Sequence, residues 1–287
     1  MILTAPAKVN LFLKVLSRRS DGYHDIETVF ERVSILDEVE IVKGEGFSEI
    51  ICDDPSVPTG EGSLMARAVD LFKKETGEKG HFRISVRKRI PIAAGMGGGS
   101  SDTAAILEGL NRMSLCSVSR ERLMALGGVL GADIPFFLSG ASFAVGTGKG
   151  DLIKPLNYNC RLWHVMVNPP FGVSTQGVYS SLPAFGLTKG GAVDKMFSAF
   201  LSNNDTAGIS ENLRNDLQII VLRDFPVLEQ VFSSLRGAGA RGVLLSGSGP
   251  TVFGLFETEK IARERENKVR EAFKPEDGWK VFAASTF

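Results

Sequence analysis

The sequence of 287 residues has only three cysteines, Cys52, Cys116 and Cys160, which stand far apart. No two of them have the spacing of a disulfide framework or of a structural zinc site, so neither is expected to hold the fold together. Unpaired cysteines are typical of proteins that fold in a reducing compartment. We therefore expect a cytoplasmic protein.

The chain also lacks an excess of charge, because 33 lysines and arginines balance 33 aspartates and glutamates. A chain with no net charge has no long-range field to attract a polyanion, so we expect no nucleic-acid partner. Nowhere do 18 apolar residues run unbroken, and the N-terminal apolar stretch contains Lys8 with no basic region ahead of it. The sequence therefore predicts no membrane span, no signal peptide and no membrane partner.

What remains is the composition of a globular protein, with 43% hydrophobic and 23% charged residues. Apolar alternation predicts strands over residues 11–16, 39–42, 84–90, 143–145, 163–167, 243–245 and 252–256, with a last strand near Val281. Helical spacing predicts helices over residues 63–77, 103–113, 119–131, 225–235 and 259–273, the first and third capped by Ser63 and Ser119.

The length allows one large domain or two modest ones. A turn-rich stretch over residues 146–151 separates the first run of strands and helices from a new strand that begins at Trp163. We therefore predict two domains, residues 1–155 and 156–287. The order of elements indicates an α/β protein of the α+β two-layer kind.

The most informative segment is a run of glycines and serines that begins after Pro91 and ends at Asp102. It follows a predicted strand and precedes an apolar helical face, so its N–H groups and the helix dipole can bind phosphate oxygens. Ser100 stands where the dinucleotide motif needs its third glycine, and no Walker-type lysine follows the loop. A tight surface turn is the alternative. Because the charge of Asp102 would repel phosphate, we expect this side chain to point away from it.

Three segments together resemble the GHMP small-molecule kinases: residues 6–11 (Pro-Ala-Lys-Val-Asn-Leu), 91–101 and 245–251 (Leu-Ser-Gly-Ser-Gly-Pro-Thr). Residues 20–24, 131–137 and 170–175 resemble one branch of them, the 4-diphosphocytidyl-2-C-methyl-D-erythritol kinases of the non-mevalonate isoprenoid pathway. The resemblance implies a two-domain GHMP kinase fold with the active site in the interdomain cleft. It also implies transfer of the ATP γ-phosphate, with Mg²⁺, to the 2-hydroxyl of the small-molecule substrate, cytidylylated methylerythritol.

The resemblance makes Asp133 the group that accepts the proton of the substrate hydroxyl. A lysine within an apolar stretch needs a partner carboxylate, and the resemblance makes Asp133 the partner of Lys8. Lys8 would keep Asp133 ionised and offset charge on the moving phosphoryl group. Ser63 stands where the family often has an asparagine near the adenine, and by the same resemblance the residues that bind the nucleotide are Pro91, Gly95, Met96, Gly97, Gly98, Gly99, Ser100, Ser101, Leu64 and Lys88.

For the acceptor, the resemblance implies that Tyr23 and Tyr179 enclose the cytosine ring while His24 bonds to its polar edge. Aromatic stacking combined with edge contacts is how proteins hold an unstacked base. The other implied acceptor contacts are Asn10, Ser246, Gly247, Ser248 and Gly249.

Ser100 is the one candidate for a metal ligand, while His81 and His164 are expected to be structural. The protein could be a monomer or a homodimer. Another GHMP kinase, acting on mevalonate, homoserine or a sugar, remains an alternative, as does a nucleotide sensor that has lost catalysis. The presence of both Lys8 and Asp133 argues against the sensor.

Overall fold

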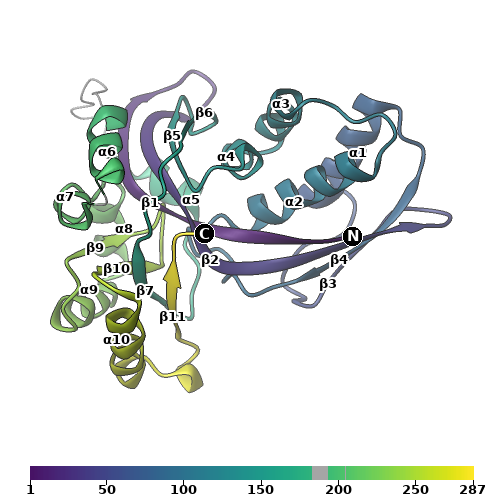
Figure 1. The fold of residues 1–287 in the computed structure, drawn as a ribbon. Coiled ribbons are helices and arrows are strands. Elements are labelled where there is room, and N and C mark those ends of the chain that lie inside the picture. Colours follow the sequence, from purple (N-terminus) through teal and green to yellow (C-terminus); the bar gives the residue numbers. More distant parts are fainter. Residues whose placement is uncertain (183–192, 204) are drawn as a thin grey trace.

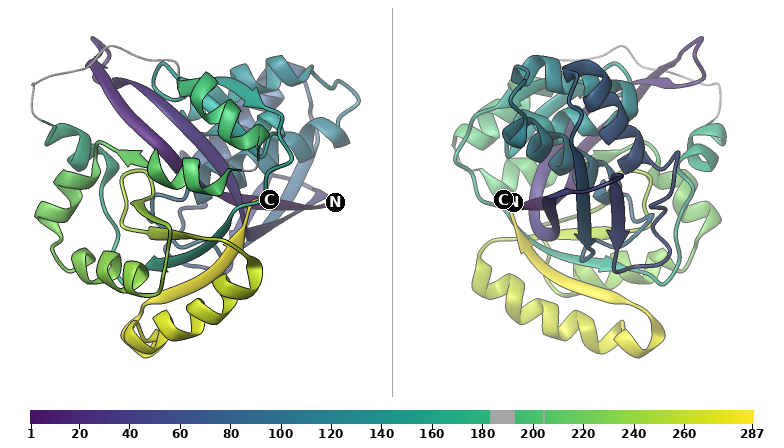
Figure 2. Two further views of the ribbon diagram at one scale, coloured as in Figure 1. Left: turned by 60° about the vertical axis from the view of Figure 1, so that its left-hand side comes forward. Right: turned by 90° about the vertical axis from the view of Figure 1, so that its right-hand side faces the viewer.

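The computed structural model describes residues 1–182, 193–203 and 205–287. Two β-sheets occupy its centre, and helices cover their outer faces (Figures 1 and 2). The first sheet has the strand order β3-β4-β2-β1-β8, and β5 pairs with both β2 and β6. Its strands are β1 (Ile2–Arg18), β2 (His24–Gly44), β3 (Glu49–Cys52), β4 (His81–Arg87), β5 (Phe143–Thr147), β6 (Leu152–Leu156) and β8 (Arg214–Asn215).

The second sheet is antiparallel and has the order β11-β7-β10-β9. Its strands are β7 (Trp163–Asn168), β9 (Gly242–Leu245), β10 (Val252–Phe256) and β11 (Lys280–Ser285). The helices are α1 (Leu64–Thr76), α2 (Gly98–Met113), α3 (Arg120–Leu130), α4 (Ile134–Ser139), α5 (Thr175–Ser180), α6 (Val193–Ser202), α7 (Thr206–Glu211), α8 (Gln218–Asp224), α9 (Leu228–Gly237) and α10 (Glu259–Ala272), with a 3-10 turn at Pro275–Asp277.

The long hairpin of β1 and β2 is the frame on which the functional residues are built. Its pairing register shifts between Pro6 and Ala7 and again between Asn10 and Phe12. Such bulges bend a strand and increase its twist. One end of β2 can therefore pair with β4 and the other with β5. Lys8 lies between the first two of the three irregularities in this pairing.

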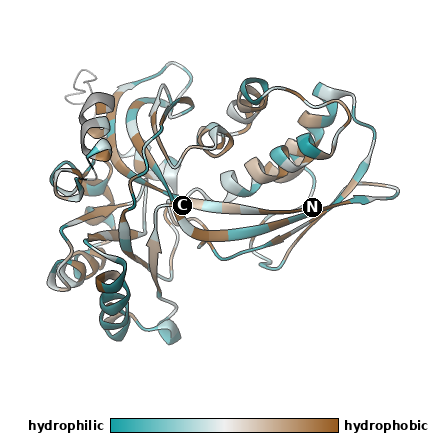
Figure 3. Ribbon diagram, in the orientation of Figure 1, coloured by the Kyte–Doolittle hydropathy of each residue, from teal (hydrophilic) through white to brown (hydrophobic). Residues whose placement is uncertain are grey.

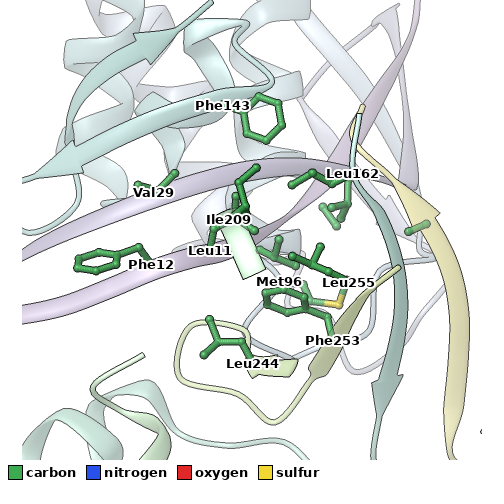
Figure 4. Close-up of a cluster of buried hydrophobic side chains, with 14 of the residues drawn as sticks. Leu11, Phe12, Val29, Met96, Phe143, Leu162, Ile209, Leu244, Phe253 and Leu255 are labelled. Carbon is green, nitrogen blue, oxygen red and sulfur yellow. The ribbon is translucent and has the colours of Figure 1, made fainter. Parts of the chain in front are cut away.

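Three apolar cores hold these layers together. One lies between the first sheet and the four helices α1, α2, α3 and α4, and another lies between the second sheet and α8, α9 and α10. The core between the two sheets includes Leu11, Phe143 and Phe253 (Figure 4). The apolar residues concentrate on the strands, whereas α10 is largely hydrophilic (Figure 3). Ala94 and Met96 of the glycine-rich segment belong to the core between the sheets, so this segment is anchored where the two sheets meet.

The predicted mixed α/β fold is confirmed, and so are the caps of α1 and α3, where Ser63 accepts from the Ala66 N–H and Ser119 from the Arg122 N–H. The first strands are much longer than predicted, because residues that break the alternation pair across bulges. Helix α4 was not predicted, because its six residues are too few to show a helical period.

The boundary near residue 155 stays a prediction. It falls within β6, which pairs with β5 in the first sheet. Within residues 1–182, 193–203 and 205–287, none of the helices combines the length and apolar character needed to cross a membrane.

Candidate active site

The three segments that carry the resemblance converge on one cleft of about 1650 Å³. Residues far apart in the chain, including Lys8, Gly97, Asp133 and Gly247, line it together. A cavity that holds one drug-sized ligand has a volume of about 300–1,000 Å³, so this cleft has room for two substrates side by side.

The glycine-rich loop forms one wall of the cleft. Ala93, Gly95 and Gly97 have φ angles of 52°, 73° and 70°, so every second residue is left-handed. An alternation of this kind turns successive N–H groups toward one point and makes an anion-binding concavity. Helix α2 starts directly afterwards at Gly98, and Gly97 is its N-cap residue without a side-chain cap. The first N–H groups of α2 therefore point into the cleft from the same wall as the loop.

The loop over residues 246–249 packs directly against this wall. A Cβ on Gly95 would lie 2.2 Å from the Ser246 carbonyl oxygen, so the two backbones touch. A Cβ on Gly247 would lie 3.2 Å from the Lys8 Nζ and 3.3 Å from the Asn10 Oδ1. The N-terminal, central and C-terminal segments thus meet at the ammonium group of Lys8.

A chain of hydrogen bonds fixes Lys8. Its Nζ donates to the Asn10 Oδ1 at 2.7 Å, the Asn10 amide donates to the Thr28 hydroxyl at 2.8 Å, and that hydroxyl donates to the Phe12 carbonyl at 2.7 Å. The Lys8 ammonium also lies 5.6 Å from the centre of the Phe30 ring. Lys8 is 5% exposed, and its remaining neighbour is the carboxylate of Asp133, with Nζ and Oδ2 3.5 Å apart.

Asp133 stands immediately before α4, whose five residues from Ile134 to Leu138 are all buried. Burial fixes the helix and so fixes the residue ahead of it. About a third of the Asp133 side chain is exposed, at 31%, so the carboxylate can meet a substrate in the cleft while it pairs with Lys8. The predicted pair of Lys8 and Asp133 is therefore present in the geometry.

Aromatic residues also line the cleft. The rings of His24 and Tyr179 lie 5.3 Å apart and are tilted by 31°. Tyr23 is exposed, and the Lys149 ammonium lies 5.2 Å from its ring centre. Burial lowers the pKa of His24, with a further contribution from the charge of Arg18. Burial and the nearby Asp133 carboxylate raise the pKa of Tyr179, so near pH 7 this wall offers a neutral imidazole and a neutral phenol.

Four of the predicted contact residues make contacts that hold the site together, and their contacts with substrates stay predictions. Ser101 is buried and donates its hydroxyl proton to the Pro6 carbonyl, which ties α2 to β1. The side chain of Met96 lies in the core between the sheets, while its carbonyl accepts from the Lys8 N–H. The other two are Ser246, which is buried and donates to the Gly95 carbonyl, and Gly249, whose N–H donates to the Ser246 carbonyl.

Met96 and the remaining predicted residues line the cleft: Pro91, Gly95, Gly97, Gly98, Gly99, Ser100, Leu64, Ser63 and Lys88, predicted for the nucleotide, and Asn10, Tyr23, His24, Tyr179, Gly247 and Ser248, predicted for the acceptor. The hydroxyl of Ser63 is already engaged as the cap of α1. Asn10 is 1% exposed and its Oδ1 holds Lys8. Their contacts with substrates remain predictions.

Some residues of the cleft were not anticipated. Thr175, at the start of α5, shares a hydrogen bond of 2.8 Å with the Ser248 hydroxyl. Arg18 and Lys149 add positive charge near the aromatic end. Lys149 lies in the turn-rich stretch that suggested a domain boundary, and a basic residue among glycines was a usable signal. Neither His81 nor His164 lines the cleft, and the His164 Nε2 lies 3.0 Å from the Glu31 Oε1, within the protein interior.

Asp102 is buried and turned toward Lys88. Burial, together with the charge of Asp37, raises the pKa of Asp102 to about 7 even though Lys88 opposes the shift. The expectation that Asp102 avoids the phosphates is consistent with this arrangement.

Among the described residues, no group of three or more histidines, cysteines, aspartates and glutamates could hold a metal ion. Mg²⁺, however, usually keeps several waters and takes one or two protein oxygens together with substrate phosphates. Asp133 and Ser100 supply such oxygens, and a Cβ on Gly131, two residues before Asp133, would lie 3.9 Å from the Ser100 Oγ. This donor set fits a magnesium ion that arrives with ATP.

Two family models match the chain: the GHMP kinases N terminal domain over residues 63–141 and the GHMP kinases C terminal over residues 196–275. A protein of Geobacter metallireducens named 4-diphosphocytidyl-2-C-methyl-D-erythritol kinase is 40% identical over 264 residues, which covers 92% of each chain. A protein of the same name from Desulfotalea psychrophila is 38% identical over 286 residues, covering 98% of this chain and 93% of that one.

Among solved structures, a kinase of the same name is more similar to this chain than homoserine kinase is. A crystal structure of 4-(cytidine 5'-diphospho)-2C-methyl-D-erythritol kinase superposes with a TM-score of 0.82 at 34% identity, covering 99% of this chain and 98% of the other. Homoserine kinase from Cytophaga hutchinsonii has a TM-score of 0.74 at 18% identity, covering all of this chain and 94% of the other. At that identity, the likeness to homoserine kinase concerns the fold alone.

Proposed function

The chain belongs to the 4-diphosphocytidyl-2-C-methyl-D-erythritol kinases of the GHMP superfamily, and from this premise we propose how its cleft phosphorylates the acceptor. The protein transfers the γ-phosphate of ATP to the 2-hydroxyl of 4-(cytidine 5'-diphospho)-2-C-methyl-D-erythritol, a step in the non-mevalonate route to isoprenoids. The observation that carries the mechanism is the pair of Lys8 and Asp133 at the point where all three motif segments meet.

Asp133 receives the proton of the reacting hydroxyl. As the acceptor oxygen bonds to the γ-phosphorus, the bond from that phosphorus to the β,γ-bridging oxygen breaks, and ADP leaves. The hydroxyl proton passes to the Asp133 carboxylate. An aspartate has this role in other kinases, and its partial exposure leaves room for the hydroxyl beside it.

Lys8 supplies positive charge at the same place. Phosphoryl transfer spreads charge over the three oxygens of the moving group, so preorganised cations contribute most of the catalysis. The bonds that hold Lys8 to Asn10 and the stack below it on Phe30 fix the ammonium before substrates bind. Little reorganisation is then needed during the reaction.

ATP places its phosphates against the left-handed loop and the start of α2, and its adenine toward Ser63 and Leu64. Asp133 and Ser100 would hold a Mg²⁺ ion that arrives with ATP, and such an ion would offset the charge of the phosphates. The loop and α2 then orient the γ-phosphate toward the acceptor.

The cytosine occupies the end of the cleft lined by Tyr23, His24 and Tyr179. Ring faces give the base a stacking surface, and a neutral imidazole offers one donor and one acceptor to its edge. The lowered pKa of His24 supports this role, since a charged imidazole would present only donors.

A direct assay measures ADP release with the cytidylylated acceptor, without any acceptor, and with mevalonate or homoserine in its place. Of these acceptors, we expect only the cytidylylated compound to support ADP release, with a product that carries one phosphate on the 2-hydroxyl. Equal activity with mevalonate or homoserine would make the protein a different GHMP kinase. ATP binding without turnover on any acceptor would make it a sensor.

A further inference from the structure

The glycine-rich loop that leads into α2 is called the phosphate loop from here on. Beneath it lie three charged side chains that the mechanism above does not use. Lys88, just after β4, bonds through its Nζ to the Oδ2 of Asp37 on β2 and, at 2.6 Å, to the Oδ2 of Asp102 on α2. The side chains of Lys88, Asp37 and Asp102 are 7%, 0% and 1% exposed. We call them the buried triad.

The triad spans both ends of the phosphate loop. Asp37 also accepts the backbone N–H groups of Arg89 and Ile90, the latter at 2.8 Å, and these residues lead into the loop. Asp102 stands in the second turn of α2, directly after the loop. Lys88 therefore cross-links the entry of the loop to the helix at its exit.

Contacts with the loop make this cross-link tight. A Cβ on Gly98 would lie 3.1 Å from the Ile90 Cγ2 and 3.3 Å from the Lys88 Nζ. The ammonium of Lys88 thus sits against the first residue of α2, where N–H groups face the cleft. A shift of Lys88 or Ile90 would move the start of this helix.

The two carboxylates do unequal work. Both oxygens of Asp37 are engaged, by one ammonium and two backbone N–H groups. Only one oxygen of Asp102 is bonded, to Lys88, and its Oδ1 has no hydrogen-bond partner among the described residues. The same Asp→Asn change should therefore be costly at position 37 and mild at position 102.

From this geometry we propose that Asp37 and Lys88 are positioning residues for ATP, which set the shape of the phosphate loop through the buried triad. Lys88 was expected to bind the nucleotide itself. Its ammonium is instead held between two carboxylates, so it acts on ATP through the loop. The proposal rests on the proposed function in one respect, namely that ATP binds at this loop.

The test compares ATP affinity, measured by calorimetry, with thermal stability in six proteins: the wild type, Asp37→Asn, Asp53→Asn, Lys88→Met, Asp102→Asn and the Lys88→Met, Asp102→Asn double variant. We expect Asp37→Asn to weaken ATP binding on the order of 10–100-fold, because displacements of about 1 Å have effects of this size. Asp53→Asn is the matched control: Asp53 is exposed and accepts the Lys88 N–H at 2.8 Å, but it does not belong to the triad. It should leave ATP affinity within about twofold of wild type, since exposed hydrogen bonds contribute little.

The lysine gives a second comparison that does not depend on Asp37→Asn folding. Lys88→Met leaves two buried carboxylates close together without their cation, and ATP affinity should fall. Adding Asp102→Asn removes one of those charges, so the double variant should regain at least about threefold of the lost affinity. A merely structural triad would recover melting temperature without recovering ATP affinity.

Several outcomes would overturn the proposal. If Asp37→Asn or Lys88→Met lowers the melting temperature but leaves ATP affinity as in the wild type, the triad is structural only. An additive Lys88→Met, Asp102→Asn pair would show that the charges do not act as a unit. Failure of the wild type to bind ATP would instead refute the proposed function, and so the two failures are distinguishable.

Discussion

The glycines of the phosphate loop allow one substitution to be compared at two positions with opposite expected results. Gly95 has a φ of 73°, and a Cβ there would lie 2.2 Å from the Ser246 carbonyl oxygen and 2.9 Å from the Gly249 nitrogen. All of these contacts are backbone, which cannot rotate away. Gly99 lines the cleft and is exposed, its φ is not left-handed, and its Cβ would meet no protein atom within 4 Å.

For Gly95→Ala we expect two costs. The left-handed backbone costs an alanine about 1–2 kcal/mol, and forcing the loops apart costs about 1–3 kcal/mol. The total of roughly 2–5 kcal/mol should lower the melting temperature by about 3–10 °C in a protein of this size. Because the displaced loop borders Lys8 through Gly247, turnover should fall as well.

Gly99→Ala should behave in the opposite way. Alanine in a helix is more favourable than glycine by up to about 1 kcal/mol, so the melting temperature should hold or rise. The added methyl group nevertheless enters the wall of the cleft against which we propose that the phosphates lie. ATP affinity should therefore fall by roughly tenfold, or about 1.4 kcal/mol.

Thermal unfolding and calorimetric titration with ATP test both variants. Unchanged ATP affinity in Gly99→Ala would mean that the phosphates do not lie against the start of α2. A Gly95→Ala protein as stable as wild type would contradict the close packing of the two loops.

Four further outcomes follow from the site. Asp133→Asn should lower kcat by on the order of 10²–10⁴-fold with little change in ATP affinity, and adding Lys8→Ala should cost little more because the two act as a unit; near-normal turnover would refute the role of Asp133. Tyr179→Ala should weaken the acceptor roughly 5-fold to 150-fold without changing the KM for ATP, and Tyr179→Phe, which keeps the ring, serves as its control. The wild type should prefer the cytidylyl over the uridylyl compound, and His24→Ala should narrow that preference when both are assayed side by side. Since the pKa of Asp102 is raised to about 7, the folded protein keeps a proton on this carboxyl that the unfolded chain releases near pH 4. The folded state therefore loses stability as the pH rises from about 4 to 7, and Asp102→Asn should gain stability relative to wild type between pH 5 and pH 8. Equal pH profiles of stability for the two proteins would contradict the raised pKa.

The sequence predicted well those features whose causes are local. A serine before an apolar helical face caps that helix, and Ser63 and Ser119 do so. Glycines that alternate along a loop permit the left-handed angles found at Gly95 and Gly97. The apolar stretch around Lys8 indicated that its ammonium needs a carboxylate, the resemblance named Asp133 as that partner, and the two groups lie 3.5 Å apart.

Features that depend on long-range packing could not be predicted. Asp37, Lys88 and Asp102 come from three elements, and nothing in their spacing marks them as neighbours. Helix α4 is too short to show a helical period, so the sequence did not predict the buried helix that positions Asp133.

The serine pair shows how a local pattern can be correct and still misassign a side chain. Both serines were expected to bind phosphate, but in a helix successive residues differ in direction by about 100°. The helical period of α2 does not separate them, because Ala104, four residues after Ser100, is buried just as Ala105 and Ile106 are. The two serines differ in what lies over each position. Ser101 meets β1, where its hydroxyl donates to the Pro6 carbonyl, whereas Ser100 lines the cleft. A contact between segments 95 residues apart therefore decides which serine bonds the helix to its sheet, and the loop sequence alone does not show it.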